Sequence, residues 1–444
     1  MKSQSIQTDV VVVGGGLAGL TAASYLARSG VAVILFEKGS TLGGRASTQE
    51  HHAFRFNRGI HALYPGGAGS TVLQELGISY AGHSPKAIFN LYKGRLWVAP
   101  VDMFSLLRTD LLDMADKLNL MHLLAVIPRL NAFELRGRSV QEWLEGNIER
   151  PRVRQLMEAQ ARTFVYSNAL DLVSAEVFIL KTQFALKHPV VYLDGGWQSL
   201  IDGLHQAAVK AGARIMSGVR VETVEVRSGR VQGVLLNNGD IVQAHAVVAA
   251  MSPKEALKLV DRDRYPALSR TAGSIIPAQV ACLDVALRSL PDPRYPVVQD
   301  LEHPRFMSTQ SVYSHVAPEG GALIYTFKQL DPIHPGDPRE DECDLEALLD
   351  TVQPGWRNVL ARRQYLPRID AIGMLPMAAN EGYSGRPGTQ VTGIDNLYLA
   401  GDWIGDGFLS DASFGSARQA ASQILQQLSP GSASNKGLFR SHPG

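Results

Sequence analysis

Cysteine is nearly missing from this chain. Two cysteines, Cys282 and Cys343, occur among 444 residues, which excludes a disulfide framework and any cysteine-rich metal site. We therefore expect no metal centre. Two isolated thiols are typical of a reducing compartment, and we expect a cytoplasmic protein.

An excess of charge of one sign is also missing. The chain has 43 Lys and Arg against 42 Asp and Glu, and its formal net charge is +1. Proteins that bind nucleic acid normally carry a basic surplus. We therefore expect no nucleic-acid partner.

Long apolar runs are the third absence. A membrane-spanning helix needs about 18 apolar residues in a row, and no stretch of this sequence approaches that length. The valines at 10–13 are preceded by Asp9 and followed by three glycines, which indicates a buried strand entering a turn and not an export signal. We expect a protein that is soluble or that lies on a membrane surface.

The N-terminal segment, by contrast, has the complete pattern of a β-α-β unit. Four valines at 10–13 are typical of a parallel strand that is covered on both faces. A glycine-rich turn, a helix expected over 20–29 and a second apolar strand at 31–36 follow directly. This order predicts a short right-handed crossover between two parallel strands.

The glycines of that turn have the spacing of a dinucleotide-binding motif. Gly14 allows a tight turn, Gly16 lets the backbone approach a pyrophosphate, and Gly19 lets the helix pack closely on the strand. Glu37 follows Gly19 by 18 positions, near the spacing of about 20 for a carboxylate that binds ribose hydroxyls. The motif therefore predicts a Rossmann-type site for an adenosine with a free 2′-hydroxyl.

Two further segments favour FAD over NAD. Gly43-Gly44-Arg45 follows Glu37 at once and places a second glycine turn and a cation beside the same phosphates. Near the C-terminus, an apolar strand over 396–400 leads into Gly401-Asp402-Trp403 and a final helix expected from about Ala412. No second dinucleotide motif occurs, which argues against a separate NAD(P)H site.

Together these segments resemble the flavin-containing amine oxidase superfamily, and within it the branch of phytoene desaturases and protoporphyrinogen oxidases. The run Gly195-Gly196-Trp197-Gln198-Ser199-Leu200 and the block from Val221 to Val248 add to the resemblance. The resemblance implies an α/β fold with a Rossmann-type FAD-binding domain (GR2-like) and a discontinuous α+β substrate domain.

Carried over residue by residue, the resemblance implies a site for non-covalent FAD. Gly14, Gly16 and Gly19 would hold the pyrophosphate, Glu37 the adenosine ribose, and Arg45 the region between phosphate and isoalloxazine. The other residues implied to bind the cofactor beside these positions are Leu17, Ala18, Lys38, Gly44, Gly59, Ile60 and His61.

The resemblance extends the site to three later segments. Val221 would meet the adenine through its backbone, while Gly401 and Asp402 would contact the pyrophosphate and the ribityl chain. Ala412 and Ser413 would start a helix that points at the flavin pyrimidine, where its N-terminus stabilises the negative charge of reduced flavin.

The motifs occur at the start, middle and end of the chain, so we expect two discontinuous domains. The expected FAD-binding domain comprises 1–85, 190–265 and 368–428, the substrate domain comprises 86–189 and 266–367, and a disordered tail comprises 429–444.

The substrate is predicted less directly. We expect a dehydrogenase or desaturase that moves a hydride from a hydrophobic isoprenoid-like or tetrapyrrole-like molecule to flavin N5. His61, in a loop resembling the segment that passes the flavin, is the candidate acid or base. The apolar helical stretch at 104–127 indicates either core packing or a lipid-facing surface. The sequence names neither electron acceptor nor oligomeric state.

Two other functions stay open. In the amine oxidases of the superfamily a lysine beside N5 follows a Gly-Ser-apolar-apolar sequence, whereas Gly273-Ser274-Ile275-Ile276 is followed here by Pro277. That proline weakens the amine oxidase hypothesis. A non-redox flavoprotein, acting as an isomerase or dehydroxylase, or a lipid-binding escort on the same fold is the third hypothesis.

Overall fold

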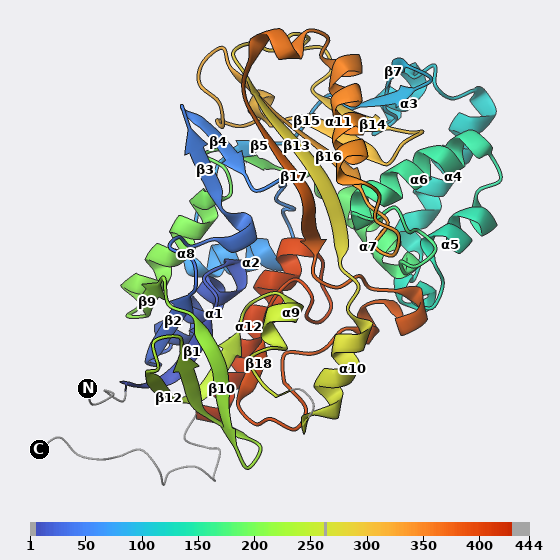
Figure 1. Ribbon diagram of the computed structural model, residues 1–444. Coiled ribbons are helices and arrows are strands. Elements are labelled where there is room, and N and C mark those ends of the chain that lie inside the picture. Colours follow the sequence, from blue (N-terminus) through green and yellow to red (C-terminus); the bar gives the residue numbers. More distant parts are fainter. Residues whose placement is uncertain (1–5, 262–263, 429–444) are drawn as a thin grey trace, which may run out of the picture.

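The computed structural model describes residues 6–261 and 264–428 (Figure 1). The expected disordered tail at 429–444 lies outside these residues. The described chain contains two seven-stranded sheets and two small two-stranded sheets.

The first large sheet contains the expected β-α-β unit. Its strand order is β10 (Val221–Arg227), β11 (Arg230–Leu236), β12 (Ile241–Ala249), β1 (Ile6–Val13), β2 (Val33–Glu37) and β9 (Arg214–Ser217), and β18 (Leu397–Leu399) also pairs with β12. β1 is parallel to both β12 and β2, with Val10 opposite Ala246 and Val33. The valines at 10–13 are buried, which agrees with their sequence pattern.

Helices cover one face of this sheet. They are α1 (Leu17–Arg28), α2 (Ala68–Leu76), α8 (Gln198–Lys210) and α12 (Leu409–Leu428). They share one apolar core with Val10 and Val12 of β1. Val11 and Val13 point the other way, into a core closed by the β10–β11 hairpin and by the loops that follow β12 and β18.

The second large sheet is mostly antiparallel. Its strand order is β17 (Leu360–Ile372), β13 (Ala278–Leu287), β16 (Ala322–Gln329), β15 (Arg305–Thr309), β14 (Val297–Asp300), β6 (Phe89–Tyr92) and β7 (Arg95–Val98). Helix α11 (Pro338–Val352) packs Leu345, Leu348 and Leu349 against one face. The opposite face meets the loop after β4 (Phe54–Asn57), which pairs with β3 (Thr48–His51).

A helical layer lies beside the second sheet, on the right in Figure 1. It contains α3 (Met103–Arg108), α4 (Met114–Val126), α5 (Val140–Asn147), α6 (Pro151–Val165) and α7 (Ala175–Ala185), which share one core. The stretch expected to be helical at 104–127 is broken between Thr109 and Asp113. The Thr109 hydroxyl donates to Val98 O at 2.7 Å, and Asp113 caps the start of α4.

The expected division into two domains stays a prediction, and two elements lie differently from its boundaries. Strand β17 continues the second sheet to Ile372, past the expected boundary at 367/368, because its pairing with β13 extends that far. Helix α10 (Pro266–Ser274) packs Leu268 into the core of the first sheet, although 266–367 was assigned to the substrate domain. The short β5 (Gly82–His83) pairs with β8 (Tyr192–Leu193) where the chain returns to the first domain.

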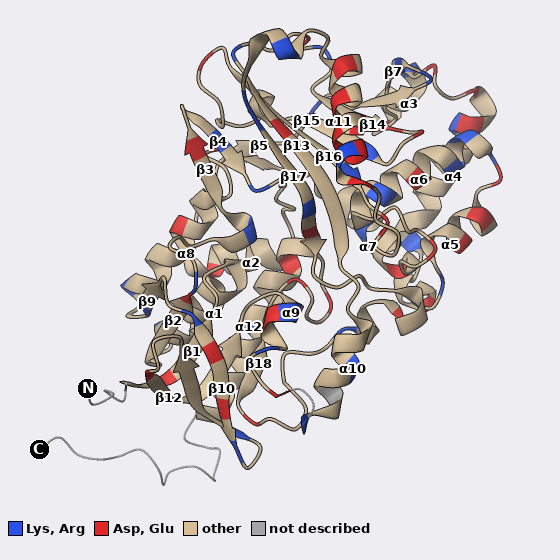
Figure 2. Ribbon diagram, in the orientation of Figure 1, with Lys and Arg blue, Asp and Glu red and all other residues tan. Residues whose placement is uncertain are grey.

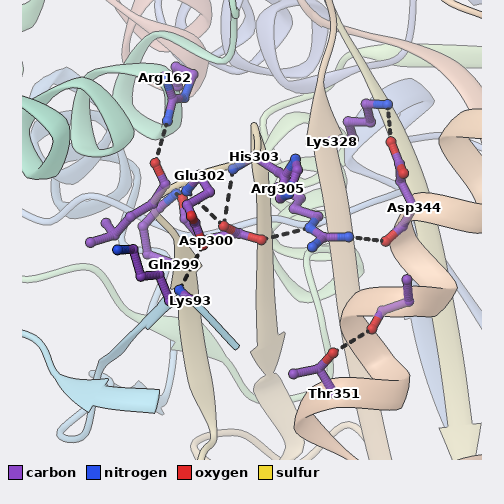
Figure 3. A network of polar contacts seen from close by, with 12 residues as sticks. Lys93, Arg162, Gln299, Asp300, Glu302, His303, Arg305, Lys328, Asp344 and Thr351 are labelled. Atoms are coloured by element: carbon purple, nitrogen blue, oxygen red, sulfur yellow. Dashed lines mark hydrogen bonds and ion pairs between the residues drawn. The ribbon is translucent and has the colours of Figure 1, made fainter. Parts of the chain in front are cut away.

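A buried polar network ties the second sheet to its neighbours (Figure 3). Asp300 accepts hydrogen bonds from Glu302 N at 2.9 Å and His303 N at 3.1 Å, and forms an ion pair with Arg305 at 2.7 Å. Arg305 also donates to Asp344 O of α11 at 2.7 Å. Two backbone N–H groups and Arg305 compensate the buried charge of the Asp300 carboxylate. These contacts hold the turn between β14 and β15 in place.

Charged residues of both signs are interspersed along the described chain, as Figure 2 shows. This distribution agrees with the near-zero net charge of the sequence. In the ranges 6–261 and 264–428, no helix has the length and apolar character needed to cross a bilayer.

Candidate functional site

The glycine turn between β1 and α1 has the close packing that its motif predicts. Gly14 has φ of +108° and donates its N–H to Phe36 O at 2.8 Å. A Cβ atom on Gly14 would lie 2.3 Å from Ala250 O, and one on Gly19 would lie 1.8 Å from Gly14 O. Both positions therefore require glycine, and α1 begins directly above the ends of β1 and β12.

The N-terminus of α1 is an open anion site. Gly16 is its N-cap, without a capping side chain, and no acidic residue lies in the first turn. A Cβ atom on Gly16 would meet only Gly43 O, at 3.7 Å. The N–H groups of Leu17, Ala18 and Gly19 belong to the first turn, where no intrahelical acceptor exists, so they remain available to phosphate oxygens.

Glu37 is held rigidly at the end of β2. Its two carboxylate oxygens accept the N–H groups of Gly15 and Gly39, each at 2.7 Å. The backbone of residues 218–221 lies alongside, since Val219 donates to Glu37 O at 3.0 Å. Val221, the first residue of β10, is thereby brought near Glu37, which agrees with a shared adenosine site.

Lys38 turns to a different partner. Its ammonium group forms a 2.9 Å ion pair with Glu255 of α9 (Pro253–Ala256), and both side chains are exposed. Because the Lys38 side chain is paired with Glu255 at the surface, only the backbone of Lys38 would contact the cofactor.

Arg45 and Asp402 meet although 357 positions separate them in the sequence. The Arg45 guanidinium donates to both Asp402 oxygens, at 2.9 and 2.5 Å, and to Asp370 O at 2.9 Å. Asp402 also accepts Gly373 N at 2.8 Å. Burial raises the pKa of Asp402, but Arg45 and the Gly373 N–H outweigh it and hold the pKa below its ordinary value.

The second glycine turn lies against the first. Gly43 donates its N–H to Gly15 O at 2.8 Å. Gly44 has φ of +56°, and a Cβ atom there would meet nothing within 4 Å. Gly44 and Arg45 therefore border open space next to the N-terminus of α1.

Helix α12 starts earlier than the sequence predicted. It begins at Leu409, so Ala412 and Ser413 complete its first turn instead of opening the helix. Gly401 donates its N–H at 2.9 Å to Ser416 on the next turn, a contact that no motif indicated. This bond fixes the Gly401 turn against the helix.

His61 lies where the loop after β4 meets the second sheet. Its Nδ1 is 3.0 Å from Gly59 O, and its ring centroid is 5.0 Å from that of Trp197. Gly59 has φ of +83°, and a Cβ atom on it would be 2.9 Å from Ile369 Cδ1. Burial lowers the pKa of His61, and the nearby charge of Arg45 lowers it further, so the imidazole is neutral at pH 7.

Trp197 is a member of this site that the sequence showed only as part of a supporting motif. Its backbone N–H donates to Asn57 Oδ1 at 3.0 Å, which places the indole beside His61. The indole Nε1 is buried and has no hydrogen-bond partner among the described residues. A water, an ion or a ligand atom would supply the acceptor that this buried donor lacks.

Arg386 is a buried arginine close to the Asp402 turn, with only 6 % of its surface exposed. It donates to Gly407 O at 2.8 Å and Met374 O at 2.6 Å. Arg386 therefore joins the segments before and after the Gly401 turn, a role that depends on long-range packing.

A family model matches nearly the whole chain. Residues 17–425 match the model described as flavin containing amine oxidoreductase. The chain belongs to this family. It is an oxidoreductase with a flavin cofactor.

Individual relatives are distant. The flavoprotein is 25 % identical over 468 residues to 4,4′-diapolycopen-4-al dehydrogenase of Metabacillus indicus, covering 90 % of this chain and 93 % of the relative. It is 24 % identical to the chloroplastic prolycopene isomerase of Daucus carota, covering 96 % and 82 % respectively. Among solved structures, a redesigned putrescine oxidase superposes with a TM-score of 0.76 at 15 % identity, covering 96 % of this chain and all of that one.

The residues present fit a flavin dinucleotide. The open α1 N-terminus suits a pyrophosphate, the rigid Glu37 carboxylate suits ribose hydroxyls, and the orphaned Trp197 Nε1 lies beside the loop expected to pass the isoalloxazine.

Proposed function

We propose that the chain binds FAD without a covalent bond and oxidises a long apolar substrate of isoprenoid or tetrapyrrole type. The α1 N-terminus would hold the pyrophosphate, Glu37 the adenosine ribose, and Arg45 with Asp402 the stretch toward the flavin. A non-covalent site is supported by the absence of cysteine from residues 402–416.

An apolar surface beside the His61 loop carries the proposal. Buried Val280, Cys282 and Phe327 on the second sheet pack with partly buried side chains, and we call the group the sheet-face cluster; its other members are Ile60, Tyr166, Phe306, Leu366, Ile369 and Ala371. The partly buried members leave apolar area uncovered where the two domains meet. Such a surface next to a flavin suits a substrate without charge along its length.

The names of the relatives support the same class, since diapolycopenal and prolycopene are long polyenes. When bound, a flavin takes a hydride at N5 from a substrate C–H that faces it. The protein then has to bind the substrate, orient it and exclude water. In this account Ile60 and the sheet-face cluster bind and orient, while neutral His61 is able to accept a proton.

A flavin amine oxidase is the second candidate, favoured by the fold likeness to putrescine oxidase. The segment next to the His61 loop argues against an amine oxidase. Pro277 lies just before β13, and the residues of β13 that reach Gly59 and Ile60 are Val280 and Cys282. Neither supplies the amine-oxidase lysine. An isomerase or a lipid-binding escort is the third candidate, and the prolycopene isomerase relative favours the former.

We also propose that α3 and the start of α4 touch a lipid surface. Six apolar side chains there are more than half exposed: Val101, Met103, Phe104, Leu107, Met114 and Leu118. Arg108 lies over the Phe104 ring at 5.1 Å, and Lys117 donates to Leu107 O at 3.0 Å. An apolar patch with cations on its rim suits insertion among lipid headgroups, and we call it the α3–α4 patch.

Two assays test this function. Acid precipitation of the purified protein should release FAD into the supernatant, because no covalent link holds it; flavin retained in the pellet would refute that part. Incubation with a soluble polyene and an electron acceptor should give a product with a changed number of conjugated double bonds. An unchanged polyene together with a consumed polyamine would establish the amine oxidase instead.

A further inference from the structure

Helix α7 carries a lysine in an unusual setting. The Lys181 side chain is buried, with 8 % of the residue exposed, in a layer otherwise packed with apolar side chains. Within residues 6–261 and 264–428, the neighbours found for its ammonium group are aromatic rings and the charge of Asp411, without a hydrogen bond or a direct ion pair. Lysine is almost never buried without a partner, because its charge loses hydration.

Aromatic rings surround the ammonium group. Lys181 Nζ lies 3.6 Å from the centroid of the Tyr64 ring, 5.3 Å from that of Phe408 and 5.9 Å from that of Phe184. Ring faces attract a cation but accept no strong hydrogen bond. The three N–H donors of the ammonium group thus remain available.

The nearest acid has another role. Asp411, in the first turn of α12, accepts Gly69 N at 2.8 Å, and the charges of Asp411 and Lys181 influence each other without direct contact. Burial lowers the pKa of Lys181 to about 8, which leaves most of it protonated at pH 7. Lys181 is therefore a cation that Asp411 does not neutralise at close range.

Two tyrosines connect Lys181 to the apolar surface proposed to bind substrate. Tyr64, whose ring faces Lys181, is close enough to Tyr166 for each to shift the pKa of the other. Tyr166 stacks on Phe327 of the sheet-face cluster, with centroids 5.5 Å apart. An apolar molecule on that cluster would meet the Tyr64 and Lys181 side chains at one end.

We propose that Lys181 determines substrate specificity by binding an oxygen-bearing end group, a carboxylate or carbonyl, on the apolar substrate. The inference rests on the proposed function and narrows its substrate class. Such an oxygen replaces the hydration that the ammonium lost, whereas a hydrocarbon end leaves the ammonium unpaired. A site with a buried donor therefore rejects a ligand that offers no acceptor.

The experiment compares two ligands on the FAD-loaded protein. Retinoic acid ends in a carboxylate, and axerophtene is the hydrocarbon of the same skeleton. Each is titrated against the wild type, Lys181→Met, Lys181→Arg and Lys187→Met, with flavin difference spectra as the readout. Lys187 follows α7, is exposed, and supplies the same change of side chain away from the site.

We expect the wild type and Lys187→Met to prefer retinoic acid by at least about tenfold, since the carboxylate accepts a hydrogen bond from the ammonium group that the hydrocarbon cannot accept. Lys181→Met should lose the preference while keeping its affinity for axerophtene, and Lys181→Arg should retain part of it. In the wild type the preference should also fall above pH 8, as Lys181 loses its proton beside Tyr64 and Asp411.

Equal affinity of the wild type for both ligands would overturn the inference but leave the proposed function intact. A preference that survives in Lys181→Met would do the same. If Lys181→Met changed FAD content or the spectrum of ligand-free flavin, Lys181 would act on the cofactor and the inference would be wrong. Failure of the wild type to bind either polyene would instead contradict the proposed function.

Discussion

At the scale of single residues, the Arg45–Asp402 pair joins the two ends of the chain at the proposed cofactor site. Asp402 is buried and keeps its charge because Arg45 and Gly373 N compensate it. Arg45 is partly exposed, so it is able to reach a bound phosphate as well. The pair therefore stabilises the fold, and Arg45 has a proposed second role in binding the cofactor. Mutation of one or both residues separates the two roles.

Replacing Arg45 by Met should weaken FAD binding roughly 10- to 100-fold, the equivalent of one hydrogen bond to a charged group at about 1.5–3 kcal/mol. It should also destabilise the fold, because Asp402 becomes an uncompensated buried carboxylate. Adding Asp402→Asn should restore stability but not FAD affinity. FAD content and thermal unfolding give the two readouts. Full recovery of FAD binding in the double variant would show that Arg45 acts only through Asp402.

The buried Lys181 should make the free energy of unfolding depend on pH. Its pKa falls from 10.5 in the unfolded chain to about 8 in the fold, so folding disfavours the charged form by roughly 3 kcal/mol at neutral pH. That cost is fully present below pH 8 and disappears as pH rises to 10.5. Lys181→Met should therefore raise the free energy of unfolding at pH 7 and reduce its rise above pH 8. A destabilised Lys181→Met measured by denaturant unfolding would contradict this.

Residues were predictable from sequence where the signal is local. Gly14, Gly19 and Glu37 follow from spacing within one β-α-β unit, and the structure gives each a geometry that explains its residue type. Trp197 and Lys181 were missed because their significance depends on an absent partner, the orphaned Nε1 and the unpaired ammonium, which no spacing reveals.

At the scale of elements, α3 and α4 show where periodicity is ambiguous. The apolar content of 104–127 indicated either core packing or a lipid-facing surface. The structure divides it: Leu106, Leu120 and Leu123 are buried, while Phe104, Leu107 and others of the α3–α4 patch are exposed. The break between the helices follows from the cap at Asp113, a local signal that the apolar pattern concealed.

The α3–α4 patch should bind lipid vesicles through its apolar side chains. Phe104→Asp combined with Leu107→Asp should abolish co-flotation with phosphatidylcholine vesicles, because each change removes apolar area that the lipid would cover and adds a charge. Val209→Asp is the matched control, since Val209 is also exposed but lies on α8 of the other domain. Flotation that persists in the double variant would exclude this surface as the contact.

At the scale of the whole molecule, the two sheets meet at the Gly59–His61 loop. The first sheet presents an open helix N-terminus and a fixed carboxylate, and the second presents an apolar face. The discontinuous arrangement was predictable because motifs recur at the start, middle and end. Its boundaries were not, since the length of β17 and the packing of α10 are decided by partners distant in sequence.

Anaerobic reduction of the bound flavin tests the central claim most directly. With oxygen excluded, a long polyene with an oxygen-bearing end should bleach the visible flavin absorbance of the purified protein, because hydride transfer to the cofactor then has no following oxidation. Primary amines and polyamines should leave the spectrum unchanged. Bleaching by an amine and not by any polyene would contradict the account, and so would a protein that purifies without flavin and takes up none.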